Sequence, residues 1–352
     1  MSWEENVRKV LPYIPGEQPQ EKDIIKLNTN ENPYPPAPGV ERLLAGFDTD
    51  LLRLYPDPNS TKLTETLASY YGVKPSQVFV GVGSDDVLAM AFLTFFHGGK
   101  PILFPDITYS FYDVWANLYG IPYIQCPLDK DFRITAADYL RPNGGIIFPN
   151  PNAPTGVLEP LSLIEEILSA NRESVVIVDE AYIDFGGTSC LPLLAKYDNL
   201  LVVQTFSKSR SMAGLRIGFA IGREKLIGYL QDAKFSFNSY TMNRTTQLLG
   251  VEAVSDDAYF KETAAKVIAT RERVKRELKE LGFTFPDSYA NFLFVSHKDC
   301  PGEKLFKALR ERKIYVRYWN KPRIDDYLRI TIGTEEQMDI MLSALREILS
   351  EK

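Results

Sequence analysis

Residues 200–222 read LLVVQTFSKSRSMAGLRIGFAIG, and this stretch is the strongest indication of the fold. It begins with a mostly apolar run rich in β-branched side chains, which is typical of a strand buried on both faces of a sheet. Such a strand would bring Lys208 to a loop at its end, with a serine on either side. A lysine between two serines is most often an ordinary surface residue, so its interpretation depends on which other motifs reach the same edge of the sheet.

A second apolar strand, within VVIVDEAYIDF (residues 175–185), ends on Asp179. Taken alone, Asp179 could simply cap a following helix. At the tip of a buried strand its carboxylate needs a positive partner, and the protonated ring nitrogen of pyridoxal phosphate is one. That cofactor also needs an amine such as Lys208 to bind its aldehyde. Tyr182, three residues beyond Asp179, could hydrogen-bond the ring oxygen.

Two further runs each combine an apolar strand with a turn. The run GGIIFPNPNAPTG covers residues 144–156, and VFVGVGSDDVLAMAFLTFF covers residues 78–96. In the second run a glycine turn leads into an apolar helix that should start near Ser84. Backbone N–H groups at such a helix start bind phosphate, because they have no partner within the helix and lie at the positive end of its dipole. Ordinary turn chemistry would explain either motif alone.

The composition favours a soluble enzyme with two domains. The 352 residues exceed the usual size of one core, and a hydrophobic content of 45% can fill two. The net charge of −6 argues against nucleic acid or an anionic membrane as the main partner. No apolar stretch is long enough to span a bilayer and the N-terminus lacks the layout of a signal peptide, so we expect a cytoplasmic protein. The three cysteines have no paired spacing, which indicates neither disulfides nor a metal site.

Taken in order, these motifs resemble the fold-type I pyridoxal-phosphate aminotransferases of class II, and within them the family that acts on histidinol phosphate. The resemblance extends from LNTNENPYPP (residues 27–36) to YLRITIGT (residues 327–334). It implies an α/β fold with a mostly parallel sheet in a large domain, residues 30–250, and a smaller α+β domain, residues 251–352. Residues 1–29, which contain several prolines, would form an N-terminal arm.

The resemblance also implies the cofactor site. Lys208 would bind pyridoxal phosphate and move the substrate's Cα proton, Asp179 would pair with the ring nitrogen, and Tyr182 would bind the ring oxygen. The other implied contacts, to the cofactor's phosphate and ring, are Gly83, Ser84, Asp85, Tyr109, Ser207 and Arg216. One position departs from the family, because Ala153 stands where most members have an asparagine that binds the ring oxygen. We expect Asn152 to take over that role.

The resemblance further implies a second subunit and a phosphorylated substrate. Tyr55, in RLYPDP, is similar to a tyrosine that reaches the cofactor phosphate of the neighbouring subunit, which implies a homodimer with shared active sites. Arg329 resembles the arginine that clamps the substrate's acidic group, and Arg317 resembles an additional phosphate ligand. Two guanidinium groups suit a dianionic phosphate better than a carboxylate. Tyr13 and Asn30 would complete the substrate site.

These residues imply that the chain transfers the amino group of L-histidinol phosphate to 2-oxoglutarate, giving imidazole acetol phosphate and glutamate in histidine biosynthesis. An aromatic amino acid aminotransferase, or a related phospho-amino-acid lyase on the same scaffold, remains the main alternative. A cofactor-carrying regulatory domain without activity is a third interpretation, and the intact Lys208 and Asp179 argue against it.

Overall fold

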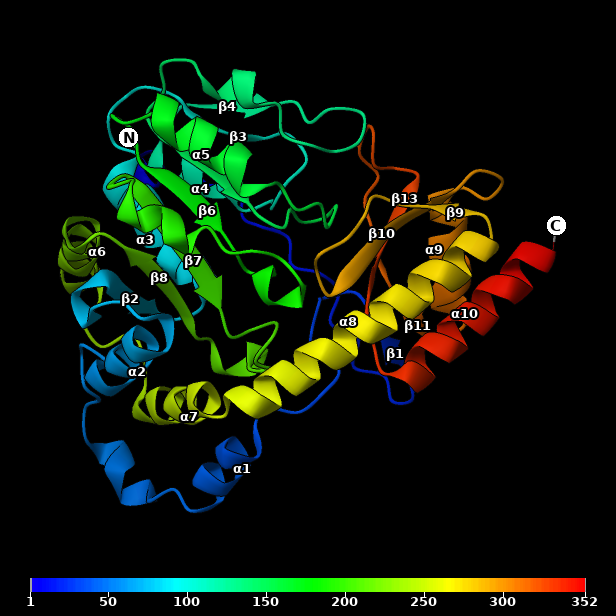
Figure 1. Ribbon diagram of the computed structural model, residues 1–352, viewed down its shortest axis with the longest axis horizontal. Coiled ribbons are helices and arrows are strands. Elements are labelled where there is room, and N and C mark those ends of the chain that lie inside the picture. Colours follow the sequence, from blue (N-terminus) through cyan, green and yellow to red (C-terminus); the bar gives the residue numbers. More distant parts are fainter. Residues whose placement is uncertain (1, 352) are drawn as a thin grey trace.

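The computed structural model describes residues 2–351 and has a seven-stranded sheet in its larger part (Figure 1). In spatial order its strands are β2 (Val78–Gly81), β8 (Gly218–Gly222), β7 (Leu200–Thr205), β6 (Val176–Asp179), β5 (Ile146–Pro149), β3 (Ile102–Pro105) and β4 (Tyr123–Cys126). Strand β8 runs antiparallel to both of its neighbours, and the other pairs are parallel. The predicted, mostly parallel sheet is therefore confirmed.

Helices cover both faces of this sheet. Successive residues of a strand point to opposite faces, and here both faces are apolar and need cover. In β6, Val176 and Val178 belong to one hydrophobic cluster and Ile177 to another. The first cluster includes side chains of α1 (Pro38–Ala45), α2 (Thr61–Tyr71), α5 (Leu161–Ala170) and α7 (Arg244–Ser255). The second includes side chains of α3 (Ser84–Phe95), α4 (Tyr112–Tyr119) and α6 (Glu224–Phe237).

The smaller part contains a four-stranded antiparallel sheet, covered by helices. Its strands, in spatial order, are β12 (Arg317–Tyr318), β13 (Tyr327–Thr331), β10 (Phe292–His297) and β9 (Phe283–Thr284), and its helices are α9 (Gly302–Glu311) and α10 (Glu335–Ser350). A separate pair joins β1 (Ile25–Lys26) in parallel to β11 (Ile314–Tyr315), so the end of the N-terminal arm is tied to this part of the chain.

The long helix α8 (Asp257–Glu280) connects the two parts (Figure 1). The helix ends two residues before Gly282, whose φ of 89° is a left-handed conformation that glycine adopts freely. Short 3₁₀ turns occupy several connections: Trp3–Asn6, Thr49–Arg53, Pro75–Gln77, Ala136–Tyr139, Ile183–Phe185, Leu191–Ala195 and Ala213–Leu215. Within residues 2–351, no helix combines the length and apolarity that crossing a membrane requires.

We propose an arm at residues 1–29, a large domain at residues 30–250 and a small domain at residues 251–352. A second hydrophobic cluster, formed mainly by β10, β13, α9 and α10 together with α8, supports this division. It also includes Leu27 of the arm and Ala153, Tyr182 and Phe185 of the large domain. Residue 250 lies within α7, which packs against α1 and α2, so that helix belongs with the large domain.

The fold gathers the motifs at one edge of the large sheet, where parallel strands present their carboxyl ends. Asp179 is the last residue of β6, and Lys208 lies three residues beyond the end of β7. The loop at residues 150–156 follows β5, and the segment at residues 106–111 follows β3. Residues that are far apart in the sequence therefore reach one site.

Candidate active site

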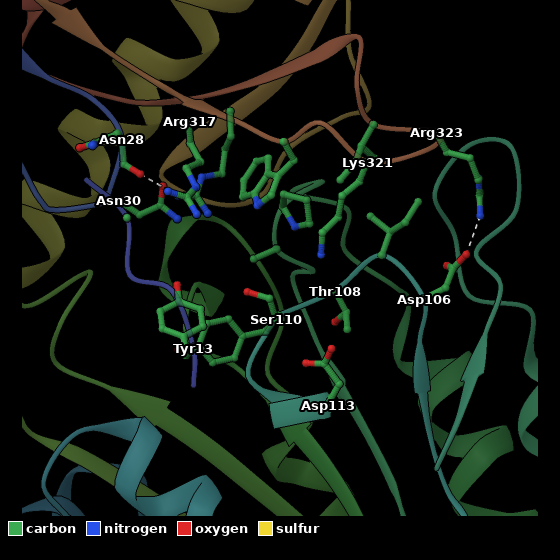
Figure 2. A pocket seen from close by; sticks show the side chains of 18 of the residues that line it. Tyr13, Asn28, Asn30, Asp106, Thr108, Ser110, Asp113, Arg317, Lys321 and Arg323 are labelled. Carbon is green, nitrogen blue, oxygen red and sulfur yellow. Dashed lines mark hydrogen bonds and ion pairs between the residues drawn. The ribbon is translucent and has the colours of Figure 1, made fainter. Parts of the chain in front are cut away.

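Two cavities meet at this edge of the sheet. The smaller, about 140 Å³, is lined by residues at or after the ends of β2, β3, β5, β6 and β7. The larger, about 560 Å³, lies between the sheet edge, the N-terminal arm and the small domain (Figure 2). Tyr109, Ala153, Tyr182 and Lys208 line both cavities, so the two are adjacent at these residues. This arrangement provides one compartment for a cofactor and a second for a substrate.

Lys208 lies where the sequence predicted, in the loop after β7. Its Nζ donates a hydrogen bond to the carbonyl of Thr29 (3.2 Å) and lies 5.9 Å from the centre of the Tyr182 ring. The loop is held by Asn32, whose Nδ2 donates to the carbonyls of Lys208 (3.0 Å) and Ser209 (3.2 Å). Burial, and then the positive charge of Arg329, lower the pKa of Lys208 to about 8. The amine therefore loses its proton far more readily than a surface lysine does.

Asp179 is buried at the end of β6, and it lines the smaller cavity. Its Oδ2 accepts a hydrogen bond from the Tyr112 hydroxyl (3.0 Å), and its Oδ1 accepts one from the Ala181 N–H (3.2 Å). Burial raises the pKa of Asp179 to about 6, although both hydrogen bonds act in the opposite direction. The described residues directly after Asp179 form a turn and no α-helix, so the helix-capping interpretation does not apply. A buried carboxylate in this state is suited to a cationic partner such as a protonated ring nitrogen.

A phosphate cradle lies beside Lys208. Helix α3 begins at Ser84, as predicted, and its free N–H groups lie next to Ser207 and Arg216 along the smaller cavity. Arg216 donates to the Asp85 carboxylate (2.8 Å) and to the Ser207 hydroxyl (3.4 Å). Gly83 has a φ of 86°, and a Cβ there would lie 2.5 Å from Nη2 of Arg216. A larger residue at position 83 would displace the Arg216 guanidinium. The N–H groups of α3, the Ser207 hydroxyl and this guanidinium together form a donor set that fits a cofactor phosphate.

Tyr109 provides an aromatic wall beside this cradle. Its hydroxyl donates to Asp85 (2.7 Å), so a single carboxylate orients both Tyr109 and Arg216. The small side chains of Ala153 and Ala181 line the same cavity and leave room for a ring. The residues present therefore fit pyridoxal phosphate: an amine, an acid, a phosphate cradle and an aromatic surface.

The structure contradicts the expectation for Asn152, which lines neither cavity. Its Nδ2 donates to the Ile107 carbonyl (3.0 Å) and the Thr155 hydroxyl (3.0 Å), and its Oδ1 accepts from the Thr108 hydroxyl (3.2 Å). All of the hydrogen-bonding groups of this buried amide are used to hold its own loop against the segment after β3. The side chain has no donor left for a cofactor oxygen.

Asn30 lies next to Tyr182 and also lines the larger cavity. Its Nδ2 donates to the Tyr182 hydroxyl (2.9 Å), which leaves that hydroxyl's own hydrogen free to donate to a cofactor oxygen. Thr331 fixes the asparagine, since its hydroxyl accepts from the Asn30 N–H (3.0 Å) and donates to Oδ1 (3.1 Å). The structure thus places Asn30 as a support of Tyr182 rather than as an isolated substrate ligand.

Arg317 and Arg329 face each other across neighbouring strands. They are paired in the register of β12 and β13, and both guanidinium groups lie against the Trp319 ring, at 5.4 Å and 5.2 Å from its centre. Neither forms an ion pair with any residue between 2 and 351. Nη2 of Arg329 donates to the Asn28 carbonyl (2.8 Å), while its buried Nε has no partner. Burial, and then Arg317, lower the pKa of Arg329 to about 10.

Two unpaired cations side by side make an anion site, because like charges directly opposite each other in a sheet are destabilising without a counter-charge. Tyr13 belongs to the same end of the larger cavity. Its ring stacks on Phe111 (4.0 Å between centres), and its hydroxyl points toward the arginines in Figure 2. The predicted substrate residues Tyr13, Arg317 and Arg329 are thus brought together.

Tyr55 is not brought to either cavity of its own chain. Its side chain is 80% exposed, and its ring lies against that of Tyr240, at 4.8 Å between ring centres. Two neighbours, Leu52 and Leu54, are also exposed. The site of a single chain therefore lacks the tyrosine that the resemblance implied.

Several residues of the site escaped sequence reasoning, namely Thr29, Asn32, Asp106, Tyr112, Thr205, Trp319 and Arg323. Arg323 is the clearest case, since it joins the small domain to the segment after β3 by an ion pair with Asp106 (2.7 Å) (Figure 2). A buried tyrosine such as Tyr112 needs a hydrogen-bond partner, so its position in an apolar segment could have indicated a polar contact. The sequence does not show which group that partner is.

The comparisons with known proteins agree with this geometry. Residues 22–345 match the family model for class I and II aminotransferases. The histidinol-phosphate aminotransferase of Lactococcus lactis subsp. cremoris (strain MG1363) is 52% identical over 352 residues, which are 100% of this chain and 99% of the relative. Histidinol-phosphate aminotransferase 1 of Hydrogenovibrio crunogenus is 54% identical over 347 residues, covering 99% of this chain and 98% of the relative.

Solved structures show the same fold. The histidinol-phosphate aminotransferase of Clostridium acetobutylicum matches with a TM-score of 0.86 at 23% identity, over 94% of this chain and 100% of that one. The enzyme of Sinorhizobium meliloti, solved in complex with pyridoxal-5'-phosphate, matches with a TM-score of 0.84 at 23% identity, over 93% of this chain and 91% of that one.

Proposed function

The chain belongs to the histidinol-phosphate aminotransferases, within the class I and II aminotransferase family, and we infer that it transfers the amino group of L-histidinol phosphate to 2-oxoglutarate. The products are imidazole acetol phosphate and glutamate, and the reaction belongs to histidine biosynthesis. Pyridoxal 5'-phosphate is the cofactor, and when bound it supplies an aldehyde for the substrate amine and an electron sink for the Cα electron pair.

The functional residues in and beside the smaller cavity have distinct tasks in this proposal. Lys208 holds the cofactor covalently, Asp179 keeps the ring nitrogen protonated, and Tyr182 donates to the ring oxygen. The phosphate is bound by the first turn of α3, Gly83, Ser84 and Asp85, together with Ser207 and Arg216. Tyr109 provides the surface on which the ring lies. These assignments are supported by the shared lining of the smaller cavity.

Lys208 also moves the proton at the substrate's Cα. With a pKa of about 8, roughly a tenth of the amine is neutral at pH 7, compared with well under a thousandth for an unperturbed lysine. A neutral amine at Lys208 would accept the Cα proton, and the resulting ammonium would hold that proton ready to be given back. The Thr29 carbonyl, 3.2 Å from Nζ, orients the amine and stabilises its charged form.

The single observation that carries the choice of substrate is the cross-strand pair Arg317 and Arg329. A dianionic phosphate balances two cations, whereas one carboxylate balances only one. Tyr13, Tyr109 and Trp319 line the same cavity and offer an aromatic surface to a ring. The aromatic lining would also accept phenylalanine or tyrosine, although less well because neither carries a phosphate. An aromatic amino acid aminotransferase is therefore the second candidate.

Steady-state kinetics with a panel of amino donors tests this proposal. With 2-oxoglutarate as acceptor, kcat/KM should be at least about a hundredfold higher for L-histidinol phosphate than for L-histidinol, phenylalanine or tyrosine, because only the first carries a phosphate. A preference for phenylalanine would replace the proposal by the aromatic aminotransferase. No turnover of any donor by enzyme with bound cofactor would exclude both.

We also propose that the active form is a homodimer, in which Tyr55 reaches the cofactor phosphate of the partner subunit. The exposed apolar side chains near it support this proposal: Leu52, Leu54, Tyr55, Phe237 and Tyr240. A cytoplasmic location is supported by Cys126, Cys190 and Cys300, which are buried free thiols, as is usual in a reducing compartment.

A further inference from the structure

The larger cavity has a second polar end that the phosphate site does not use. The segment after β3 and the start of α4 form this end, where Thr108, Ser110 and Asp113 line the wall. In Figure 2 these residues lie across the cavity from Arg317 and Lys321, which come from the small domain. The cavity is therefore cationic at one end and contains a carboxylate at the other.

Asp113 differs from every other acid that lines the two cavities. Asp85 accepts from Tyr109 and Arg216, Asp106 pairs with Arg323, and Asp179 accepts from Tyr112 and Ala181. The Oδ1 atom of Asp113 is buried and accepts no hydrogen bond, and the side chain has no ion pair among residues 2–351. A buried carboxylate oxygen without a donor is rare in a native structure and needs an explanation.

The protein does not supply the missing donor. The Thr108 hydroxyl on this wall donates to Oδ1 of Asn152 (3.2 Å), and no hydrogen bond joins the Ser110 hydroxyl to Asp113. Lys321, on the opposite wall, forms no ion pair within the described chain. The second oxygen of Asp113, Oδ2, is not buried and also has no partner among residues 2–351. A ligand in the cavity can reach this oxygen and is the natural source of a hydrogen bond to Asp113.

The substrate offers such a donor, and the inference that follows rests on the proposed function. L-Histidinol phosphate has a phosphate at one end and an imidazole at the other, and a neutral imidazole carries one N–H donor. Arginine and lysine cannot accept from that N–H, whereas a carboxylate accepts it in a charge-assisted hydrogen bond. We propose that Asp113 accepts a hydrogen bond from the imidazole N–H and thereby determines the specificity for an imidazole-bearing donor.

This assignment differs from two structural roles that Asp113 could have. An acid in the first turn of α4 interacts favourably with the helix dipole, and a carboxylate facing Lys321 could hold the two domains together. Either role would affect all substrates equally. Recognition of the imidazole affects only donors that carry its N–H.

The test compares two phosphorylated donors on enzyme with bound cofactor. L-Phenylalaninol phosphate keeps the amine, the phosphate and a flat ring but has no ring N–H. Asp113→Ala should lower kcat/KM for L-histidinol phosphate about tenfold to a hundredfold, mainly through KM, and should change that for L-phenylalaninol phosphate less than about twofold. Asp113→Asn keeps an acceptor oxygen without the charge and should show an intermediate loss.

Equilibrium binding provides a readout that does not depend on turnover. Imidazole acetol phosphate has no amine to react with the cofactor-loaded enzyme, so its Kd can be measured by calorimetry. Asp113→Ala should raise this Kd by the same factor as the KM for L-histidinol phosphate. Lys321→Ala is the matched control from the opposite wall, and it should not reproduce the selective loss.

Each possible outcome decides the proposal. Equal losses for both donors, or a selective loss with Lys321→Ala, would show that Asp113 acts through the cavity's shape or the domain contact, and would overturn it. A wild type that does not use L-histidinol phosphate would overturn the proposed function and this inference together. Near-ultraviolet circular dichroism and cofactor absorbance identify a variant that has failed to fold, in which case Asp113→Asn alone decides.

Discussion

The two ends of the site differ in how their charges are satisfied. In the smaller cavity Asp85, Asp179 and Arg216 each have partners within the chain. In the larger cavity Arg317 and Arg329 face each other without an acid, and Asp113 has no donor. The first arrangement suits a cofactor that stays bound, because its site keeps its shape through the whole cycle. The second suits substrates that enter and leave, because each brings the counter-charge that the free enzyme lacks.

The largest effect should come from the one group that serves both ends. Lys208→Ala should fold but lose turnover by at least about 10³-fold, because it removes the covalent anchor and the Cα proton carrier together. The measurement is the rate of the half-reaction with L-histidinol phosphate. Borohydride reduction of the wild type followed by mass spectrometry should label Lys208, and labelling of another lysine would show that the assignment is wrong.

Removal of the unpaired charge of Arg317 should weaken substrate binding without lowering the stability of the protein. Arg317→Ala should lower kcat/KM for L-histidinol phosphate by roughly ten- to a hundredfold, as expected for the loss of one charge-assisted contact. Residual turnover of phenylalanine should hardly change. Thermal unfolding of the free variant should show no loss of stability, because the substitution also relieves like-charge repulsion across the strands. A clear loss of stability would mean that Arg317 has a structural partner.

At the cofactor end, the pH dependence of stability separates the role of Asp179 in cofactor binding from its effect on folding. Its pKa rises from 3.8 in the unfolded chain to about 6 in the fold, so the folded state binds the extra proton between these values. Burying this group therefore costs nothing below pH 3.8, and the cost grows as pH rises to 6. In cofactor-free protein, Asp179→Asn should increase the free energy of unfolding by about 1–3 kcal/mol at pH 8 and by about half as much at pH 5.

Denaturant titrations at the two pH values measure this difference. With the cofactor bound, the same variant should lose affinity for pyridoxal phosphate, because the ring nitrogen loses its anionic partner. If Asp179→Asn destabilised cofactor-free protein at pH 8, the carboxylate would be contributing to the fold itself, and the two ends of the site would not differ as described.

The smallest effect concerns the subunit boundary. Tyr55→Phe should weaken retention of the cofactor by several-fold, about 1 kcal/mol, as is typical of one lost hydrogen bond. The unfolding of the protomer should be unchanged, since the Tyr55 side chain is 80% exposed in the single chain. Sedimentation at assay concentrations gives the oligomeric state, and a fully active monomer would refute the shared site.

The predictable part of the site lies where strands end. Asp179 and Lys208 could be placed from the sequence because apolar strand patterns locate the carboxyl edge of a parallel sheet. Gly83 and Ser84 could be placed because a glycine turn directly before an apolar run indicates where a helix begins. In both cases the relevant information is local, within a few residues of the side chain concerned.

The remainder depends on contacts between distant segments. The hydrogen bond from Tyr112 to Asp179 spans 67 positions, and the ion pair between Arg323 and Asp106 spans 217. Asn152 was wrongly assigned because sequence shows that an amide is present but not which way a buried one points. Tyr55 could be interpreted only by resemblance, since its expected partner belongs to another subunit.

The segment between Leu27 and Asn32 contacts three functional side chains in succession. The carbonyl of Asn28 accepts from Arg329, that of Thr29 accepts from Lys208, and the Asn30 side chain donates to Tyr182. The strand β1 pairs immediately before this segment, so its register is fixed at the start. Insertion or deletion of a single residue here would shift all three contacts at once. Length should therefore be far less variable in this short segment than in the exposed arm before it, even where individual side chains can be exchanged.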